Sequence, residues 1–351
     1  MTVTKETVLD ALKSVKFPSG GDLVGADKVR AIGIDQGAVR FVLEGANAQE
    51  VSVLEALKPQ AEAAVAAIPG VTSVTINTLS MQGPHIGGHP KPQSGPLAVE
   101  GVAKIIVIGS GKGGVGKSTV SSNLAVALAR AGKRVGLLDA DIYGPSQPRM
   151  MGISRRPASP DGKTILPLMA HGVTVMSIGL MLKEDEAVIW RGPMLMGAMQ
   201  QMLGQVKWNE YGPLDVLLID LPPGTGDVQL TLCQKTKLDG AIVVSTPQDV
   251  AMLDARKALN MFERLNTPVL GLIENMSTYV CPKCGHEEHL FGHGGVASEA
   301  AKIGLPFLGE LPLDLATRLG GDSGTPIALG DTPMAQAYAA LAAKLIASGA
   351  I

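Results

Sequence analysis

The sequence predicts an α/β fold: a doubly wound, mostly parallel sheet preceded by a small α+β domain. Three observations predict it. From residue 100 onward, short aliphatic runs alternate with helix-like segments. Hydrophobic residues make up 46% of the chain but aromatic residues only 3%, and aliphatic side chains suit a sheet covered on both faces. A Gly/Pro-rich stretch separates two regions of different character, so the predicted organisation is a domain at 1–79, a linker at 80–99 and a domain at 100–351.

The N-terminal region shows the pattern of a small mixed domain. Apolar residues spaced over 8–15 predict a short amphipathic helix, and residues 48–67 predict an Ala-rich helical region interrupted or kinked at Pro59. A turn at Asp35-Gln36-Gly37 joins two predicted strands. The three strands expected here cover residues 29–34, 39–43 and 71–76.

The C-terminal region alternates predicted strands with predicted helices. Helical spacing of apolar residues marks faces over 120–131, 251–265 and 334–345. The strands expected between them are Lys104–Ile108, Val135–Leu138, Asp215–Ile219, Ala241–Val244 and Val269–Ile273. Continuous apolar strands between helices are typical of a parallel sheet buried on both faces.

Composition limits the classes of partner. The net charge of −2 gives no general attraction to nucleic acid or to an anionic membrane. No run of 18 apolar residues is long enough to span a bilayer, and the N-terminus lacks the apolar core of a signal peptide. Three cysteines argue against a disulfide framework. We therefore expect a cytoplasmic protein with reduced thiols, without a nucleic-acid or membrane partner.

A phosphate-binding loop follows the first strand of the C-terminal region. It reads Gly111-Lys112-Gly113-Gly114-Val115-Gly116-Lys117-Ser118 and opens a helix. Its glycines let backbone N–H groups converge on phosphate oxygens, and the helix N-terminus adds positive potential. Lys117 is expected at the β- and γ-phosphates, the Ser118 hydroxyl at Mg²⁺ and Thr119 near the α-phosphate. The predicted cofactors are ATP and Mg²⁺.

Acidic residues end two of the predicted strands. After the second strand, Asp139 is expected at Mg²⁺ and Asp141 in catalysis beside the attacking water, although such residues also serve as helix caps. Asp220 ends an apolar strand, as expected of a Walker B carboxylate that holds the metal's water shell. Gly224 follows in a Pro/Gly-rich loop and can offer its N–H to the γ-phosphate.

A second motif is Cys281-Pro282-Lys283-Cys284-Gly285, in which two thiolates lie close enough to share a metal or a cluster. Two thiolates do not complete a four-ligand site. The missing ligands come from the same pair of a second subunit, from a histidine in cis, or from Cys233, which the sequence places in a helix as a core thiol. An unmetallated or redox-active pair is the remaining alternative. The histidines concerned, expected as solvated loop residues, are His286, His289 and His293.

The early lysine of the phosphate loop resembles the deviant Walker A motif of the MinD/nitrogenase-iron-protein group. The resemblance implies that Lys112 reaches across a homodimer interface to the partner's nucleotide, where a second cation offsets charge in phosphoryl transfer. It also implies that Asn275 reads the adenine edge, and that Pro312 and Asp314 lie at the other base contacts.

The combination of motifs resembles the Mrp/ApbC family of iron–sulfur cluster carrier ATPases. The segments that carry the resemblance are 111–119, 139–146, 190–194, 220–227, 274–277 and 281–285. It implies that Cys281 and Cys284 of two subunits bridge one labile [4Fe–4S] cluster, which passes to apo-proteins with ATP binding or hydrolysis coupled to loading or release. Segment 190–194, Trp-Arg-Gly-Pro-Met, has no mechanism that the sequence reveals.

Residues 1–79 resemble the small iron–sulfur-assembly domain often fused to these carriers, whose partners include scaffold proteins. The acidic Asp-Pro-Glu stretch usual after its first helix is replaced here by Phe17–Asp22, and no cysteine precedes Cys233. Recruitment of partners is the role this leaves for the domain.

Two rival functions share the nucleotide motifs. A MinD/ParA-like positioning switch calls for a basic amphipathic C-terminal helix, whereas residues 345–351 are apolar with only Lys344 nearby. A dimeric ATPase with a structural zinc clamp would use the same four thiolates. The sequence does not distinguish zinc from [2Fe–2S] or [4Fe–4S].

Overall fold

The computed structural model describes residues 3–17, 20–35, 37–45, 48–80, 98–181 and 192–351. Most of the predicted linker and the first two residues of the Trp190–Met194 segment lie outside these ranges. The chain divides into two compact units. No helix in the described ranges is long and apolar enough to cross a membrane.

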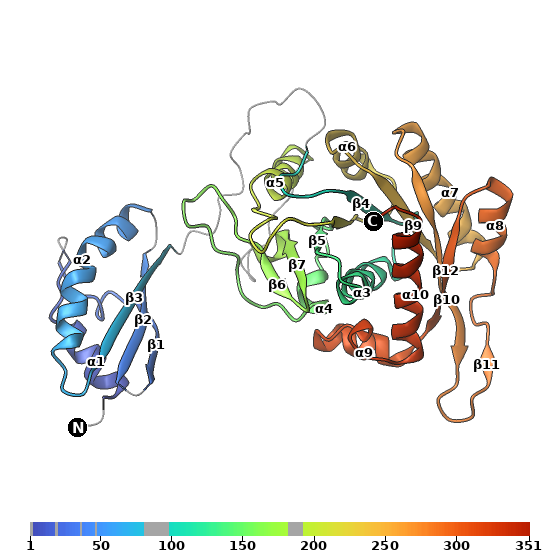
Figure 1. Ribbon diagram of the computed structural model, residues 1–351. Coiled ribbons are helices and arrows are strands. Elements are labelled where there is room, and N and C mark those ends of the chain that lie inside the picture. Colours follow the sequence, from blue (N-terminus) through green and yellow to red (C-terminus); the bar gives the residue numbers. More distant parts are fainter. Residues whose placement is uncertain (1–2, 18–19, 36, 46–47, 81–97, 182–191) are drawn as a thin grey trace. The chain divides into compact units, whose positions relative to one another are not determined.

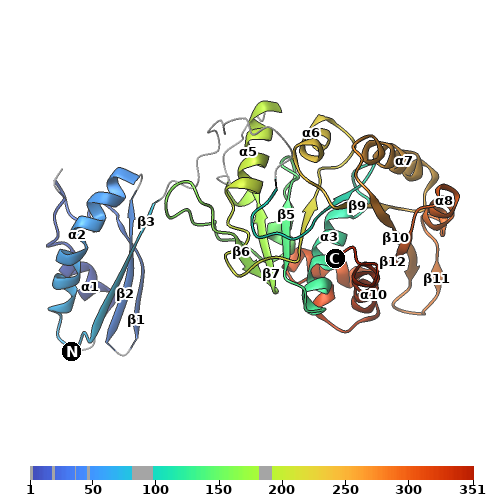
Figure 2. The same ribbon diagram turned by 45° about the horizontal axis from the view of Figure 1, so that its top comes forward.

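The described residues of the N-terminal unit form a three-stranded sheet with two helices on one face (Figures 1 and 2). Its central strand pairs antiparallel with one neighbour and parallel with the other. The predicted alternation is confirmed, because Val39, Phe41 and Leu43 are all buried. The second helix continues through Pro59 as one element, so the expected interruption is absent. In chain order the elements are α1 (Lys5–Leu12), β1 (Val29–Asp35), β2 (Ala38–Gly45), α2 (Ala48–Ala66) and β3 (Ser73–Ser80).

In its described residues, the C-terminal unit is built on a nine-stranded sheet whose order is β11-β10-β9-β4-β8-β5-β7-β6, with β12 also paired to β10. The strands from β10 to β7 run parallel, as does β12, while β6 and β11 are antiparallel edge strands. The strands are β4 (Ile105–Gly109), β5 (Val135–Asp139), β6 (Leu168–Ala170), β7 (Val173–Ser177), β8 (Val216–Asp220), β9 (Gly240–Ser245), β10 (Val269–Val280), β11 (Glu287–Glu288) and β12 (Phe307–Leu313).

Helices cover both faces of this sheet (Figure 1). One hydrophobic core packs α5 to α8 against it, and a second core packs α3 and α10 against the other face. This is the predicted doubly wound arrangement. The α-helices are α3 (Lys117–Arg130), α4 (Gln147–Met150), α5 (Gly192–Gly204), α6 (Asp227–Lys235), α7 (Asp249–Arg264), α8 (Gly295–Ile303), α9 (Leu315–Ser323) and α10 (Pro333–Ala347). Short 3₁₀ turns also occur at η1 (Ile178–Leu180) and η2 (Ile327–Leu329).

Strand β10 is longer than the sequence predicts. The apolar run ends at Ile273, but pairing with β12 and then β11 carries the strand on to Val280. Asn275 therefore lies inside the strand rather than just past it. The pairing with β12 is irregular between Asn275 and Tyr279, and Met276 has a left-handed φ of +59°. Extra residues of this kind bend a strand and re-aim its side chains.

Candidate functional site

The phosphate loop lies between β4 and α3, as predicted. Gly114 and Gly116 both adopt φ of +81°, the left-handed region that glycine tolerates. A Cβ on Gly111 would meet the backbone carbonyl of Asp254 at 2.0 Å. The loop borders an open cavity of about 220 Å³. The residues that line it are Ser110, Lys112, Gly113, Gly114, Val115, Gly116, Lys117, Ser118, Thr119, Asp141, Ser146, Met150 and Pro223.

Lys117 and Asp220 form a buried ion pair at the end of β8. The Lys117 ammonium donates to Asp220 Oδ1 at 2.5 Å, and the Ser121 hydroxyl donates to the same oxygen at 2.8 Å. The two charged side chains are 6% and 0% exposed. Burial makes such a pair expensive to separate, because either partner alone would be an uncompensated charge.

Gln147 at the start of α4 belongs to this site, although no sequence motif marks it. Its amide nitrogen donates to Asp220 Oδ2 and to the carbonyl of Ser118, both at 2.9 Å. Its Oε1 atom is buried without a hydrogen-bond partner among the described residues. An unpartnered oxygen beside a serine and a carboxylate gives the oxygen-rich donor set that Mg²⁺ prefers, so these residues fit the predicted metal.

The two predicted carboxylates at the end of β5 and just after it lie in different places. Asp139 is fully buried, and it accepts hydrogen bonds from the backbone of Asp141, Ser146 and Gln147 and from the Ser177 hydroxyl, at 3.0 to 3.1 Å. Burial and the neighbouring Asp220 raise the pKa of Asp139 to about 7. Asp141 lines the cavity. Asp139 therefore holds the loop that follows β5, while its place at Mg²⁺ and the catalytic role of Asp141 stay predictions.

Two other predicted residues make contacts within the chain. The Lys112 ammonium lies 3.4 Å from Gln248 Oε1 at the N-cap of α7. The Gly224 N–H donates to the carbonyl of Ser110 at 3.1 Å, and Gly224 has a φ of +90°. Gly224 thus connects the loop after β8 to the start of the phosphate loop.

Asn275 contacts the phosphate loop directly. Its amide donates to the carbonyl of Val115 at 2.8 Å, and a Cβ on Gly116 would lie 2.2 Å from its Nδ2 atom. Strand register pairs Asn275 with Leu311, next to Pro312 on β12. Asp314 caps α9 by accepting the Thr317 N–H at 2.7 Å. The strand pairing therefore brings the residues predicted at the base to one edge of the sheet.

The cysteine pair lies in the turn between β10 and β11. The Cys281 N–H donates to the carbonyl of His286 at 2.9 Å, and Gly285 turns the chain with a φ of +72°. Cys281 is half-buried and Cys284 exposed. Backbone N–H groups of Lys283 and Cys284, and then the Cys284 thiol, donate to the Cys281 sulfur and lower its pKa. The turn therefore favours the thiolate, the form that ligates metals.

The other predicted ligand candidates do not join the cysteine pair in one group. Cys233 lies on the buried face of α6, in the core, and burial raises the pKa of its thiol to about 12, so it is a core thiol as predicted. His286, His289 and His293 are exposed. In the described part of the chain, the His/Cys/Asp/Glu group with ligating atoms close enough for one ion comprises Glu274, His293 and Glu310, without either cysteine.

A Gly-rich loop with a buried lysine and two strand-end carboxylates, on a parallel sheet, defines a P-loop nucleoside triphosphatase. Comparison with known proteins agrees. The chain belongs to the family of NUBPL-type iron-transfer P-loop NTPases, whose model matches residues 101–346. Residues 5–76 match a model described as an iron–sulfur cluster assembly protein.

Relatives extend over both units. An iron–sulfur cluster carrier protein of Synechocystis is 43% identical over 352 aligned positions, covering 98% of this chain and 97% of that protein. A nucleotide-binding protein of Archaeoglobus fulgidus, solved with ADP and with Co found, is 41% identical with a TM-score of 0.57, covering 64% of this chain and 88% of that one. The cell-division ATPase MinD of Pyrococcus furiosus is 22% identical with a TM-score of 0.52, covering 70% and 99%, which shows the fold alone.

Proposed function

We propose that this protein is an ATP-dependent iron–sulfur cluster carrier. It binds and slowly hydrolyses ATP·Mg²⁺ at the phosphate loop, holds a labile [4Fe–4S] cluster between two copies of the chain through Cys281 and Cys284, and transfers it to apo-proteins. The names of its relatives support cluster carriage.

One observation carries this proposal: a single strand joins the nucleotide loop to the cysteine turn. Asn275 on β10 donates to the carbonyl of Val115 in the phosphate loop, and Cys281 directly follows the last residue of the same strand. Between them, Met276 has a left-handed φ, and the pairing of β10 with β12 is irregular. A change of the phosphate loop that moves Asn275 is thereby transmitted to the segment that leads to the thiolates.

At the nucleotide, the position of each residue gives its proposed role. Lys117 would exchange Asp220 for the β- and γ-phosphates, which the loop N–H groups also hold. Ser118, Asp139 and Asp220, together with Gln147, would hold the Mg²⁺. The metal ion supplies charge neutralisation on the phosphate oxygens. Asp141 faces the cavity where it can orient a water. In a dimer, Lys112 would release Gln248 and reach the partner's nucleotide.

At the cysteines, each chain supplies two thiolates and a four-ligand cluster needs four. The described structure brings no further cysteine to the turn, because Cys233 is in the core. A second copy related by a two-fold axis would complete the site with its own pair. The cluster would then be held at an exposed turn, where an acceptor's thiolates can reach it.

We also propose that the carrier works in the cytoplasm. The N-terminal unit, matched by an assembly-protein model, would recruit scaffold proteins or apo iron–sulfur clients. We propose no nucleic-acid or membrane partner, because the net charge is −2 and neither would use the cysteine pair.

The test is anaerobic purification followed by a visible absorption spectrum and by iron, sulfide and zinc analysis. We expect a brown protein with two thiolates per chain bound to cluster, and loss of colour and iron in Cys281→Ala/Cys284→Ala. Cys233→Ala is the matched control and should stay brown. Gel filtration with and without ATP then tests the dimer.

Two alternatives are decided by the same preparation. A colourless protein that takes up zinc but no cluster on reconstitution would replace the carrier by a dimeric ATPase with a structural zinc clamp. A protein without bound metal that associates with vesicles or DNA only with ATP would replace it by a MinD/ParA-like positioning switch.

A further inference from the structure

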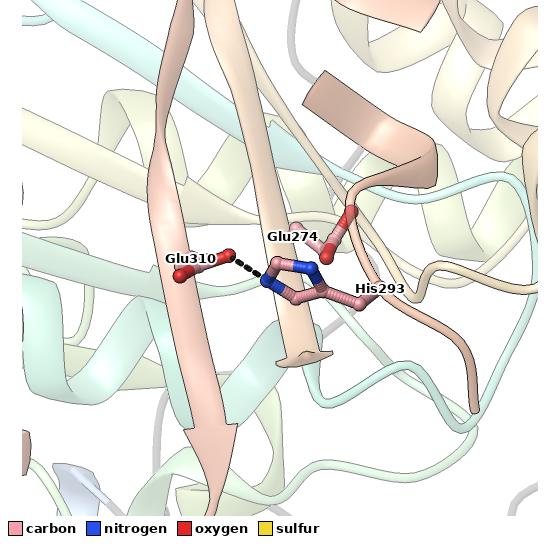
Figure 3. A group of neighbouring side chains, drawn as sticks. All are labelled: Glu274, His293 and Glu310. Carbon is pink, nitrogen blue, oxygen red and sulfur yellow. Dashed lines mark hydrogen bonds and ion pairs between the residues drawn. The ribbon is translucent and has the colours of Figure 1, made fainter. Parts of the chain in front are cut away.

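A second cluster of ligating side chains lies close in the sequence to the cysteine turn but contains neither cysteine. Glu274 comes from β10, His293 from the loop before α8 and Glu310 from β12. One ligand atom from each lies within 4.8 Å of the others. Figure 3 shows the imidazole between the two carboxylates. Its Nε2 atom lies 2.9 Å from Glu310 Oε2.

Strand register forces the two carboxylates together. Glu274 and Glu310 are direct partners on neighbouring parallel strands, so their side chains leave the same face of the sheet. Glu274 is 0% exposed. Like charges directly opposite each other destabilise a sheet, and a buried carboxylate needs compensation. The arrangement is therefore one that a cation would stabilise.

The hydrogen bonds of Glu274 orient its carboxylate and leave part of its capacity to accept ligands unused. Its Oε1 atom accepts the N–H of Gly294 at 2.9 Å, and its Oε2 atom accepts that of Val296 at 2.8 Å. These bonds fix the loop that carries His293 to the carboxylate. Each carboxylate oxygen keeps a second lone pair for a metal ion. The site has one ordered, buried ligand before any ion binds.

The other two ligands are accessible. The side chains of His293 and Glu310 are 44% and 49% exposed, which provides an entry path for an ion. His289 stacks on His293 with ring centroids 4.5 Å apart and contacts the carbonyl of Ser277 through Nδ1 at 3.2 Å. This stacking restricts the orientation of the ligating ring, as neighbours of metal ligands commonly do.

We propose that Glu274, His293 and Glu310 form a mononuclear site for a divalent first-row transition-metal ion, separate from the cysteine pair. One imidazole and two carboxylates suit Zn²⁺, Fe²⁺ or Co²⁺; soft Cu(I) would require thiolates, and Mg²⁺ prefers oxygen ligands alone. Water would complete the coordination on the exposed side. The site does not depend on the proposed cluster chemistry.

The test uses the full chain with Cys281→Ser/Cys284→Ser, without nucleotide, titrated with Co²⁺ alone. Visible d–d absorption and calorimetry are expected to give one ion per chain, displaced by Zn²⁺. His293→Ala and the conservative Glu310→Gln should each weaken binding by about tenfold or more. His286→Ala, which alters a neighbouring exposed His–Glu pair, should leave binding unchanged.

Three results would overturn the proposal. The first is the absence of saturable Co²⁺ binding in the cysteine-free chain. The second is equal affinity in His293→Ala, Glu310→Gln and the His286→Ala control. The third is a signal abolished by Ser118→Ala but not by His293→Ala, which would place the ion at the phosphate loop. Cluster binding by the wild-type chain is unaffected by any of these outcomes.

Discussion

Two glycines of the phosphate loop provide a matched pair of perturbations. Gly114 and Gly116 share a φ of +81°, but a Cβ on Gly114 meets nothing within 4 Å, whereas one on Gly116 would lie 2.2 Å from Asn275 Nδ2. Alanine in the left-handed region costs about 1–2 kcal/mol. Gly114→Ala should therefore reduce the free energy of unfolding by about that amount.

Gly116→Ala should cost more. The amide of Asn275 must move away from the new methyl group, which breaks its 2.8 Å bond to the buried carbonyl of Val115. Leaving a buried polar group unsatisfied costs about 1–3 kcal/mol. Added to the backbone strain, the total is about 2–5 kcal/mol.

Urea denaturation followed by tryptophan fluorescence measures the difference in the relevant unit, because both tryptophans, Trp190 and Trp208, lie C-terminal to residue 100. In an Asn275→Ala background the methyl group no longer meets the amide, so Gly116→Ala should cost only the strain of about 1–2 kcal/mol. Equal costs for the two glycine variants, or equal costs of Gly116→Ala in both backgrounds, would refute the reasoning.

Three further outcomes are expected. In metal-free protein, iodoacetamide should alkylate Cys281 at a lower pH than it alkylates a free cysteine, because the pKa of Cys281 is lowered and the thiolate is the form that reacts. Cys233 should stay unmodified in the folded chain. Mass spectrometry across a pH series measures both, and alkylation of Cys281 with the pH dependence of a free cysteine would contradict the expectation. Arg256→Ala should lower the free energy of unfolding, since it leaves the 6%-exposed Glu299 without this partner, and Arg256→Lys should lower it less. Identical denaturation midpoints for all three chains would count against this. Gln147→Ala should raise the Kd for ATP·Mg²⁺ more than that for ATP with EDTA, as calorimetry can measure, and an equal change in both would remove Gln147 from the metal position.

The sequence predicted the parts of the site that are continuous in the chain. The phosphate loop and the cysteine turn are short motifs whose spacing indicates phosphate binding and metal or cluster ligation, and strand-end carboxylates such as Asp220 follow apolar runs. No sequence pattern indicated Gln147, because its place at the site depends on the conformation of the loop before it. Asp139 holds that loop by accepting hydrogen bonds from the backbone N–H groups of Ser146 and Gln147. Glu274 and Glu310 are 36 positions apart, and only the register of β10 with β12 reveals them as neighbours.

The polar second half of β10 explains both the error in its predicted end and its role. Periodicity ended the strand at Ile273, because Glu274, Asn275 and Ser277 are not residues of an apolar run. The structure buries all three, and each forms hydrogen bonds to a different element. Glu274 fixes the loop before α8, Asn275 holds the phosphate loop, and the Ser277 hydroxyl donates to the carbonyl of Leu311. Because these three residues of β10 form hydrogen bonds to three different elements, the strand can shift only when several of these hydrogen bonds change together. The proposed coupling between the nucleotide and the cysteine turn is therefore expected to be all-or-none. The backbone can change conformation at Met276, which has a left-handed φ and lies where the pairing with β12 is irregular.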